Sequence, residues 1–199
     1  MKFHKFISVI LHPIVIPTIG VLLFLALTPD VIRKESQYIL LSLVFFSTYI
    51  VPLIFLVILK MIGVVKSFQV ESIKERKIPL YLMLLIFYVL GRYLISIPVF
   101  KDLGVLFYGT NLALLVITIL FFFKIKTSLH IVSMSSALGF FLIYGTIHSI
   151  SILPIVIVLI VLTGLLASSR LHLKAHNPLE VYLGFFLGIL SQYLGYVLL

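Results

Sequence analysis

The chain has 199 residues, is 62% hydrophobic and 11% charged, and carries a formal net charge of +9. A soluble domain is about half apolar and about a quarter charged, so this composition excludes an ordinary water-soluble protein and indicates an integral membrane protein. The chain has no cysteine, which excludes disulfides, a thiolate nucleophile and cysteine-ligated metals. Basic residues that collect in loops beside anionic headgroups explain the positive charge, so nucleic-acid binding is not needed to account for it.

Apolar runs near the roughly 20 residues that a spanning helix needs predict the fold class, an all-α polytopic membrane helical bundle of six to seven transmembrane helices. The predicted segments cover residues 7–28, 38–63, 80–98, 105–123, 130–149, 152–168 and 178–199. The first segment carries Pro13 and Pro17, which favour a broken or re-entrant helix, and it lacks the cleavage pattern of a signal peptide. Short connections and the absence of an inserted polar domain predict one transmembrane domain over residues 1–199.

Three polar stretches, residues 66–79, 124–130 and 169–180, are separated from one another by two predicted crossings each. An even number of crossings returns the chain to the same side of the membrane. The three stretches are therefore predicted to share one side, with their histidines and arginines within reach of one another.

The first of these stretches has mixed charge and includes Lys74 and Arg76. Such a stretch is usually a solvated connector. An arginine fork can, however, hold a phosphate by two parallel hydrogen bonds, and Arg170 offers a second fork from the third stretch. The two arginines together are candidates for a phosphate site.

The second stretch contains Ser128 and His130 just before an apolar run. Ser128 can cap the helix that follows, and the first free N–H groups of that helix can bind an anion beside His130. An interfacial histidine next to a helix cap is the alternative, and this motif alone favours that alternative.

The third stretch opens the last helix. Asn177 suits the N-cap position, Pro178 the first helical position and Glu180 the third. Glu180 can therefore be a capping glutamate that complements the helix dipole. It can also accept a hydrogen bond from one nitrogen of His176 and leave the other nitrogen free as a nucleophile. The two roles are compatible.

The same stretch carries a longer pattern: Ser169 and Arg170, then five residues, His176, three residues and Glu180. This pattern resembles the third signature of the type 2 phosphatidic acid phosphatase superfamily, Ser-Arg-x5-His-x3-Asp. Glutamate stands where the family has aspartate, which adds one methylene.

Two other parts of the chain resemble the remaining signatures of that family. Ser128-Leu129-His130 is similar to the second signature, Pro-Ser-Gly-His, and Arg76 to Pro79 is similar to a degraded form of the first, Lys-x6-Arg-Pro. The resemblance covers a phosphatase-like core of about residues 66–199. Residues 1–63 carry no signature and are predicted to form additional N-terminal helices.

The resemblance implies a metal-independent phosphatase without a cofactor. His176 would attack phosphorus and form a phosphohistidine, Glu180 would orient it, and His130 would protonate the leaving alkoxide and later activate water. The residues expected to hold the phosphate are Arg170, Arg76, Ser128, Ser169 and Lys74. The implied substrate is a lipid phosphate or diphosphate of the phosphatidic acid, phosphatidylglycerol phosphate or prenyl diphosphate type.

Two other classes of function stay open. Thr127 and Leu129 replace the family's proline and glycine, and Gln69 stands where its lysine is expected, which favours a non-catalytic relative that binds phosphorylated lipid headgroups. A small transporter would need a polar path deep in the bundle, where Arg92 and Asn111 are among the few polar residues.

The sequence leaves the side of the membrane open and does not indicate an oligomeric state. The positive-inside rule predicts a cytoplasmic location for the three polar stretches. Bacterial members of the resembled family commonly place this site on the outer side of the cytoplasmic membrane, which is the localisation that the resemblance implies.

Overall fold

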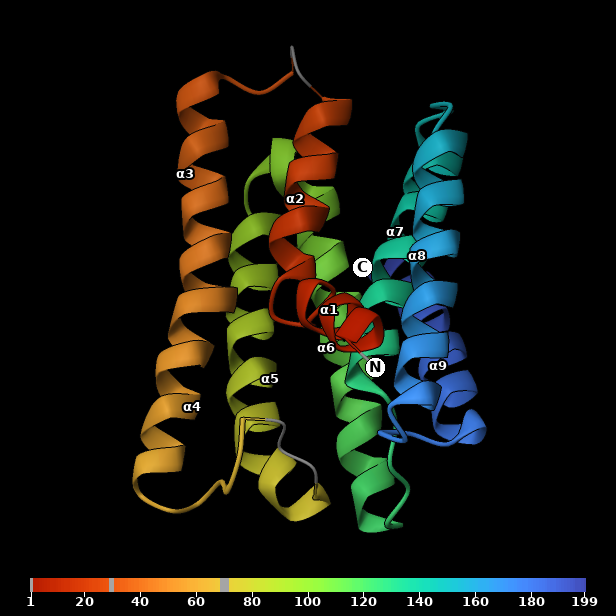
Figure 1. Cartoon of the computed structure of the whole chain (residues 1–199). Helices are drawn as coiled ribbons and strands as arrows, with labels where there is room; N and C mark the ends of the chain where they lie inside the picture. Colours follow the sequence, from red (N-terminus) through yellow and green to blue (C-terminus); the bar gives the residue numbers. More distant parts are fainter. Residues whose placement is uncertain (1, 29–30, 69–71) are drawn as a thin grey trace.

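The structure is a computed structural model that describes residues 2–28, 31–68 and 72–199, and helices dominate this part of the chain (Figure 1). In chain order these are α1 (Lys2–Ile10), α2 (Ile16–Leu27), α3 (Lys34–Phe45), α4 (Val51–Met61), α5 (Ile73–Ile95), α6 (Lys101–Phe122), α7 (Leu129–Ile147), α8 (Leu153–His172) and α9 (Pro178–Leu198). Six helices in the described residues are long and apolar enough to cross a membrane. The protein is therefore a polytopic membrane helical bundle, as predicted.

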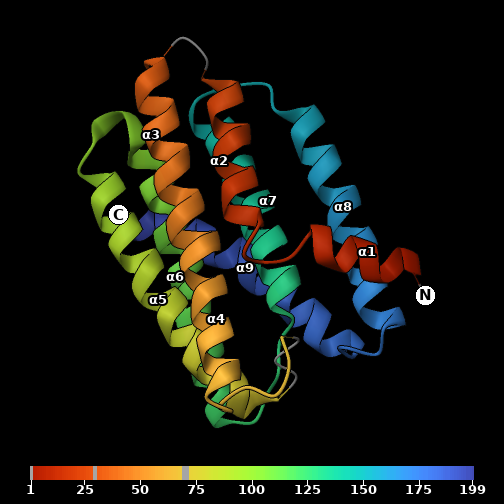
Figure 2. The same ribbon diagram turned by 60° about the vertical axis from the view of Figure 1, so that its left-hand side comes forward.

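The first apolar segment is broken, as its two prolines predicted. Residues 11–15 separate α1 from α2, and Pro17 occupies the first turn of α2, where a missing N–H costs nothing. The short α1 packs against α8 and lies across the bundle, whereas α2 runs along it (Figure 2). The predicted span over residues 7–28 is thus two helices with different directions.

Two predicted boundaries are wrong, because helices α5 and α8 extend beyond the apolar runs that signalled them. Helix α5 begins at Ile73 instead of about residue 80, with the Ser72 hydroxyl accepting a hydrogen bond from the Glu75 N–H at 3.2 Å. Helix α8 continues to His172 instead of ending at about residue 168. Polar residues in the first or last turn of a membrane helix do not belong to its apolar run. The apolar run is therefore shorter than the helix. Arg76 and Arg170 consequently lie on helices and not in loops.

The predicted span over residues 38–63 is one continuous helical rod, Lys34–Met61, that changes its winding halfway. The change is a π-helical turn at Phe46–Ile50 between α3 and α4. Helix α3 packs against α2, helix α4 packs against α5, and the π turn contacts both α2 and α5. The rod therefore bridges the N-terminal helices and the rest of the bundle.

Helices α6, α7 and α9 pack tightly through small residues. A Cβ atom added at Gly188 of α9 would lie 2.7 Å from the carbonyl oxygen of Val132 and 2.0 Å from the hydroxyl of Ser135 on α7. The Ser135 hydroxyl also donates to the carbonyl oxygen of Gly184 at 3.2 Å. Small side chains at such contacts let helix backbones approach in a membrane, where packing and interhelical hydrogen bonds hold helices together.

Replacing Gly188 by alanine is expected to lower the stability of the protein by about 1–3 kcal/mol, because the new methyl group meets backbone that cannot move aside. The measurement is the midpoint of thermal unfolding in detergent. Gly164→Ala is the matched control, since a Cβ atom there meets nothing within 4 Å. Equal unfolding midpoints for Gly188→Ala and Gly164→Ala would contradict the close contact between α7 and α9.

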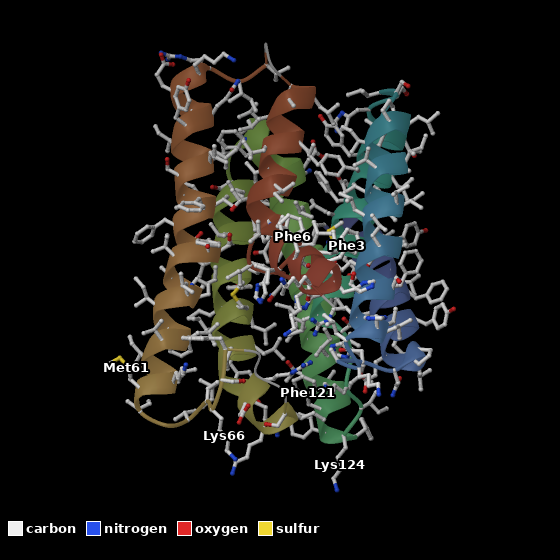
Figure 3. All side chains as sticks on the ribbon, viewed as in Figure 1. Phe3, Phe6, Met61, Lys66, Phe121 and Lys124 are labelled. Carbon is white, nitrogen blue, oxygen red and sulfur yellow. The ribbon has the colours of Figure 1, made fainter. Side chains whose placement is uncertain are left out.

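The connections α4–α5, α6–α7 and α8–α9 lie at the same end of the bundle, as the crossing count predicted (Figure 1). Figure 3 shows Lys66 and Lys124 extending from this end, while Phe3 and Phe6 mark α1 on the outside of the bundle. This end is called the motif end below. It holds the start of α5, the start of α7, the end of α8 and the start of α9.

Candidate functional site

A cavity of about 170 Å³ extends from the motif end into the bundle. Four of the candidate residues line it: Arg76, His130, Arg170 and His176. Apolar side chains from five helices form much of the remaining wall, among them Ile16, Phe55, Phe87, Phe107 and Phe141. The structure therefore brings the arginines and histidines of three separate polar stretches together at the polar end of an otherwise apolar cavity.

His176 lies in the connection between α8 and α9, with only 1% of its side chain exposed. Its Nδ1 atom donates a hydrogen bond to Oε2 of Glu180 at 2.5 Å. The cap of α9 is made by Asn177, whose side-chain oxygen accepts from the Glu180 N–H at 2.9 Å. The carboxylate of Glu180 is therefore turned toward the imidazole, and Nε2 of His176 is the ring nitrogen left for chemistry.

Burial, and after it the positive charges of Arg76, Arg170 and Lys126, lower the pKa of His176 to about 3. The imidazole is consequently neutral at pH 7. A histidine nucleophile needs this state, because only an unprotonated nitrogen has a lone pair to offer.

Backbone contacts hold the three polar stretches against one another. Nη1 of Arg76, a residue only 8% exposed, donates to the carbonyl oxygen of Thr127 at 3.4 Å. The N–H of Ser128 donates to the carbonyl oxygen of Glu180 at 3.3 Å. These hydrogen bonds join parts of the chain that are about 50 residues apart in sequence, at the positions of the signature residues.

Besides Glu180, which contacts His176, the structure places three other candidate residues outside the cavity lining. Ser128 occupies the N-cap position of α7, but its hydroxyl makes no capping hydrogen bond, so the predicted side-chain cap is wrong. Ser169 is buried beside Arg170, and its hydroxyl donates to the carbonyl oxygen of Leu165 at 2.8 Å. Neighbouring residues on a helix point about 100° apart, so Arg170 faces the cavity and Ser169 does not. Lys74 is exposed on the first turn of α5, and Gln69 falls outside the described residues.

Two residues beside the candidate side chains were not predicted. Ser8 of α1 accepts a hydrogen bond from Nη1 of Arg170 at 2.6 Å, and its carbonyl oxygen accepts one from Nε2 of His130 at 3.1 Å. His12 lines the cavity, with its ring centroid 5.0 Å from that of His130 in an edge-to-face arrangement. The only signal in the sequence is that both polar residues interrupt the first apolar run.

Comparison with protein-family models, curated proteins and solved structures finds no match for this chain. Two guanidinium groups and three imidazoles surround one small cavity, and a carboxylate supports one of the imidazoles. This set can bind an oxyanion, offer a nitrogen nucleophile and move a proton.

Single cysteines introduced at Lys66, Lys124 and Lys174 are expected to react with a membrane-impermeant maleimide from the same side, because all three are exposed at the motif end. Lys101→Cys, at the start of α6, is expected to react only from the opposite side. The chain has no cysteine of its own, so no background has to be removed. Labelling in intact and in permeabilised cells also gives the absolute orientation, and opposite behaviour among the first three would contradict the shared end.

Proposed function

We propose that this protein is a membrane phosphatase of the type 2 phosphatidic acid phosphatase kind, which hydrolyses a lipid phosphate or diphosphate. The observation that supports this most is the convergence of Arg76, His130, Arg170 and His176 on one cavity. The Glu180 contact to His176 adds the support that a nucleophilic imidazole needs.

In the proposed reaction, Nε2 of His176 attacks phosphorus, and the bond between phosphorus and the lipid oxygen breaks. Arg76 and Arg170 hold the nonbridging oxygens and stabilise the charge that develops on them. His130 enters the reaction as an imidazolium, with its Nε2 proton donated to the Ser8 carbonyl oxygen, and it gives its Nδ1 proton to the leaving alkoxide, which leaves the ring neutral. It then takes a proton from water, which attacks the phosphohistidine and releases inorganic phosphate. For a monophosphate the sum is lipid phosphate plus water going to lipid alcohol plus phosphate, and for a diphosphate the leaving group is the lipid monophosphate.

The apolar wall of the cavity favours a lipid as the carrier of the phosphate. A cavity of about 150 Å³ holds one benzene-sized group, so the 170 Å³ here suits the first few carbons next to the phosphate. The rest of the lipid chain would stay in the bilayer. The protein would act as a multi-pass protein of the cell membrane, and a bacterial cytoplasmic membrane is the location that the family resemblance favours.

The experiment that tests this proposal is release of inorganic phosphate by the purified protein in detergent. The substrates are prenyl monophosphates and diphosphates, phosphatidic acid and phosphatidylglycerol phosphate, and turnover of at least one of them is expected. Saturable binding of these lipids without turnover would replace the proposal by a headgroup-binding protein. Flux of a solute through reconstituted liposomes without hydrolysis would replace it by a transporter.

A further inference from the structure

Ser8 holds two residues of the proposed active site at once. Its carbonyl oxygen can only accept, so the proton between it and His130 belongs to Nε2 of the histidine. In a neutral ring the other nitrogen, Nδ1, is then unprotonated. A carbonyl that selects the tautomer of a catalytic histidine acts as a carboxylate does in many enzymes.

The hydroxyl of Ser8 contacts a single nitrogen of the Arg170 guanidinium group. It accepts from Nη1 at 2.6 Å, and within the described residues the buried Nε of Arg170 has no hydrogen-bond partner. Nε and Nη2 lie along the same edge of a guanidinium group and form a fork that matches two phosphate oxygens. The contact with Ser8 therefore orients Arg170 without using that edge.

His12 adds a third imidazole with a defined tautomer. Its Nδ1 accepts a hydrogen bond from the N–H of Ile14 at 3.4 Å, so the proton of the neutral ring lies on Nε2. Burial lowers the pKa of His12 to about 4, which keeps the ring neutral at pH 7. His12 lines the cavity, and in this tautomer its Nε2–H is the group that can donate to an oxyanion.

We propose that residues 8–12 are a fourth part of the active site, in which Ser8 positions His130 and Arg170 and His12 donates a hydrogen bond to a phosphate oxygen of the substrate. This inference rests on the proposed phosphatase function. It extends the site to the N-terminal helices, which carry none of the signature residues.

The alternative is that α1 is a plug that occupies Arg170 and His130 and blocks the site. The geometry favours positioning over blocking. The cavity is present while Ser8 contacts Arg170 and His130, and Arg76, Arg170 and His176 line it together with His12. A plug that left the cavity open and used only one corner of Arg170 would not exclude the substrate.

The test compares full-length Ser8→Ala, Ser8→Thr, His12→Ala and His12→Gln with the wild type in detergent. For each protein kcat and KM for a lipid phosphate, the affinity for orthovanadate as a phosphate analogue and the thermal midpoint are measured. Val9→Ala is the control for Ser8, because Val9 is 70% exposed on the same helix. His172→Ala is the control for His12, because His172 is exposed and lies outside the cavity lining.

We expect Ser8→Ala to lower kcat about tenfold or more and to weaken orthovanadate binding, with Ser8→Thr restoring most of both because it keeps the hydroxyl. We expect His12→Ala to lower kcat/KM and orthovanadate affinity about tenfold to a hundredfold, the range for a hydrogen bond to a charged group. His12→Gln should recover part of the loss, since its amide N–H can take the place of Nε2. Thermal midpoints and both controls should stay near the wild-type values.

Three results would overturn the proposal. Higher turnover in Ser8→Ala would establish a plug. Equal losses in Ser8→Ala and Ser8→Thr that follow the thermal midpoint would mean a purely structural contact. Orthovanadate binding that is absent in the wild type or unchanged in His12→Ala would remove His12 from the site. If the wild type binds orthovanadate but turns over no lipid phosphate, the phosphatase proposal fails, and the orthovanadate measurements still decide whether the Ser8 hydroxyl orients Arg170 and whether His12 binds the oxyanion.

Discussion

Replacement of His176 by alanine is expected to reduce kcat by about 10⁵-fold or more, because the nucleophile that forms the phosphohistidine is gone. Affinity for orthovanadate should stay within about tenfold of the wild type, since Arg76 and Arg170 still bind the oxyanion. The measurement is phosphate release together with orthovanadate binding on the same preparation. A loss in turnover without a comparable loss in binding separates a nucleophile from a residue that only holds the headgroup.

A matched variant distinguishes loss of the nucleophile from misfolding. His176→Asn keeps an amide N–H near the position of Nδ1, so it can still donate to Glu180, but it offers no nucleophilic nitrogen. Both variants should therefore be inactive, and His176→Asn should keep the wild-type thermal midpoint. Turnover within tenfold of the wild type in either variant would exclude His176 as the nucleophile. Trapping of an acid-labile phosphate on the wild-type protein, absent from both variants, would support the intermediate directly.

The second large effect is expected for Glu180→Gln, with kcat falling about 10³–10⁴-fold. The carboxylate accepts the Nδ1–H of His176 at 2.5 Å and would stabilise the positive charge that the ring acquires when Nε2 bonds to phosphorus. The amide of glutamine has no charge and can turn its NH₂ group toward the ring, which would stabilise the wrong tautomer. A tautomer-fixing aspartate in serine proteases is worth a similar factor. Phosphate release over a range of substrate concentrations measures the loss.

Glu180→Gln should lower the stability of the protein far less than it lowers the activity. The cap of α9 is formed between the Asn177 side chain and the Glu180 N–H, which the substitution leaves intact, so Glu180→Gln should cost no more than about 1 kcal/mol. Glu180→Asp keeps the charge and should keep substantial activity. Wild-type turnover in Glu180→Gln would return Glu180 to a purely helix-terminal role and would remove the main local support for His176.

Much of the fold could be predicted because a bilayer imposes a length and a hydropathy on each span. The same rule fails at helix ends, where Ser72 caps α5 and Arg170 lies in the last turn of α8. These residues are polar, so they end an apolar run without ending the helix. The break after α1 was predictable because proline acts locally on the backbone.

The candidate site divides in the same way. The contact between His176 and Glu180 could be predicted, because Asn177 and Pro178 mark a helix start that places Glu180 about one turn beyond His176. The contacts of Ser8 with His130 and Arg170 could not, because 122 and 162 positions separate the partners and no spacing rule connects them. The direction of a side chain could not be predicted from the sequence either. Ser128 occupies the predicted N-cap position, but its hydroxyl makes no capping hydrogen bond.

The π-helical turn at Phe46–Ile50 sets the rotational phase of everything that follows it in the same rod. A π turn holds one residue more than the α-helical turn it replaces, so each later side chain is rotated by about 100° relative to a regular helix. Phe55 and Leu56, which lie beyond the turn, face the cavity in this phase. Shortening the turn by one residue would change the length and the hydropathy of the span only slightly, yet it would turn this wall of the cavity toward the lipid. The rotational position of the side chains on one helix, and not the composition of that helix, thus decides whether the cavity is closed on that side.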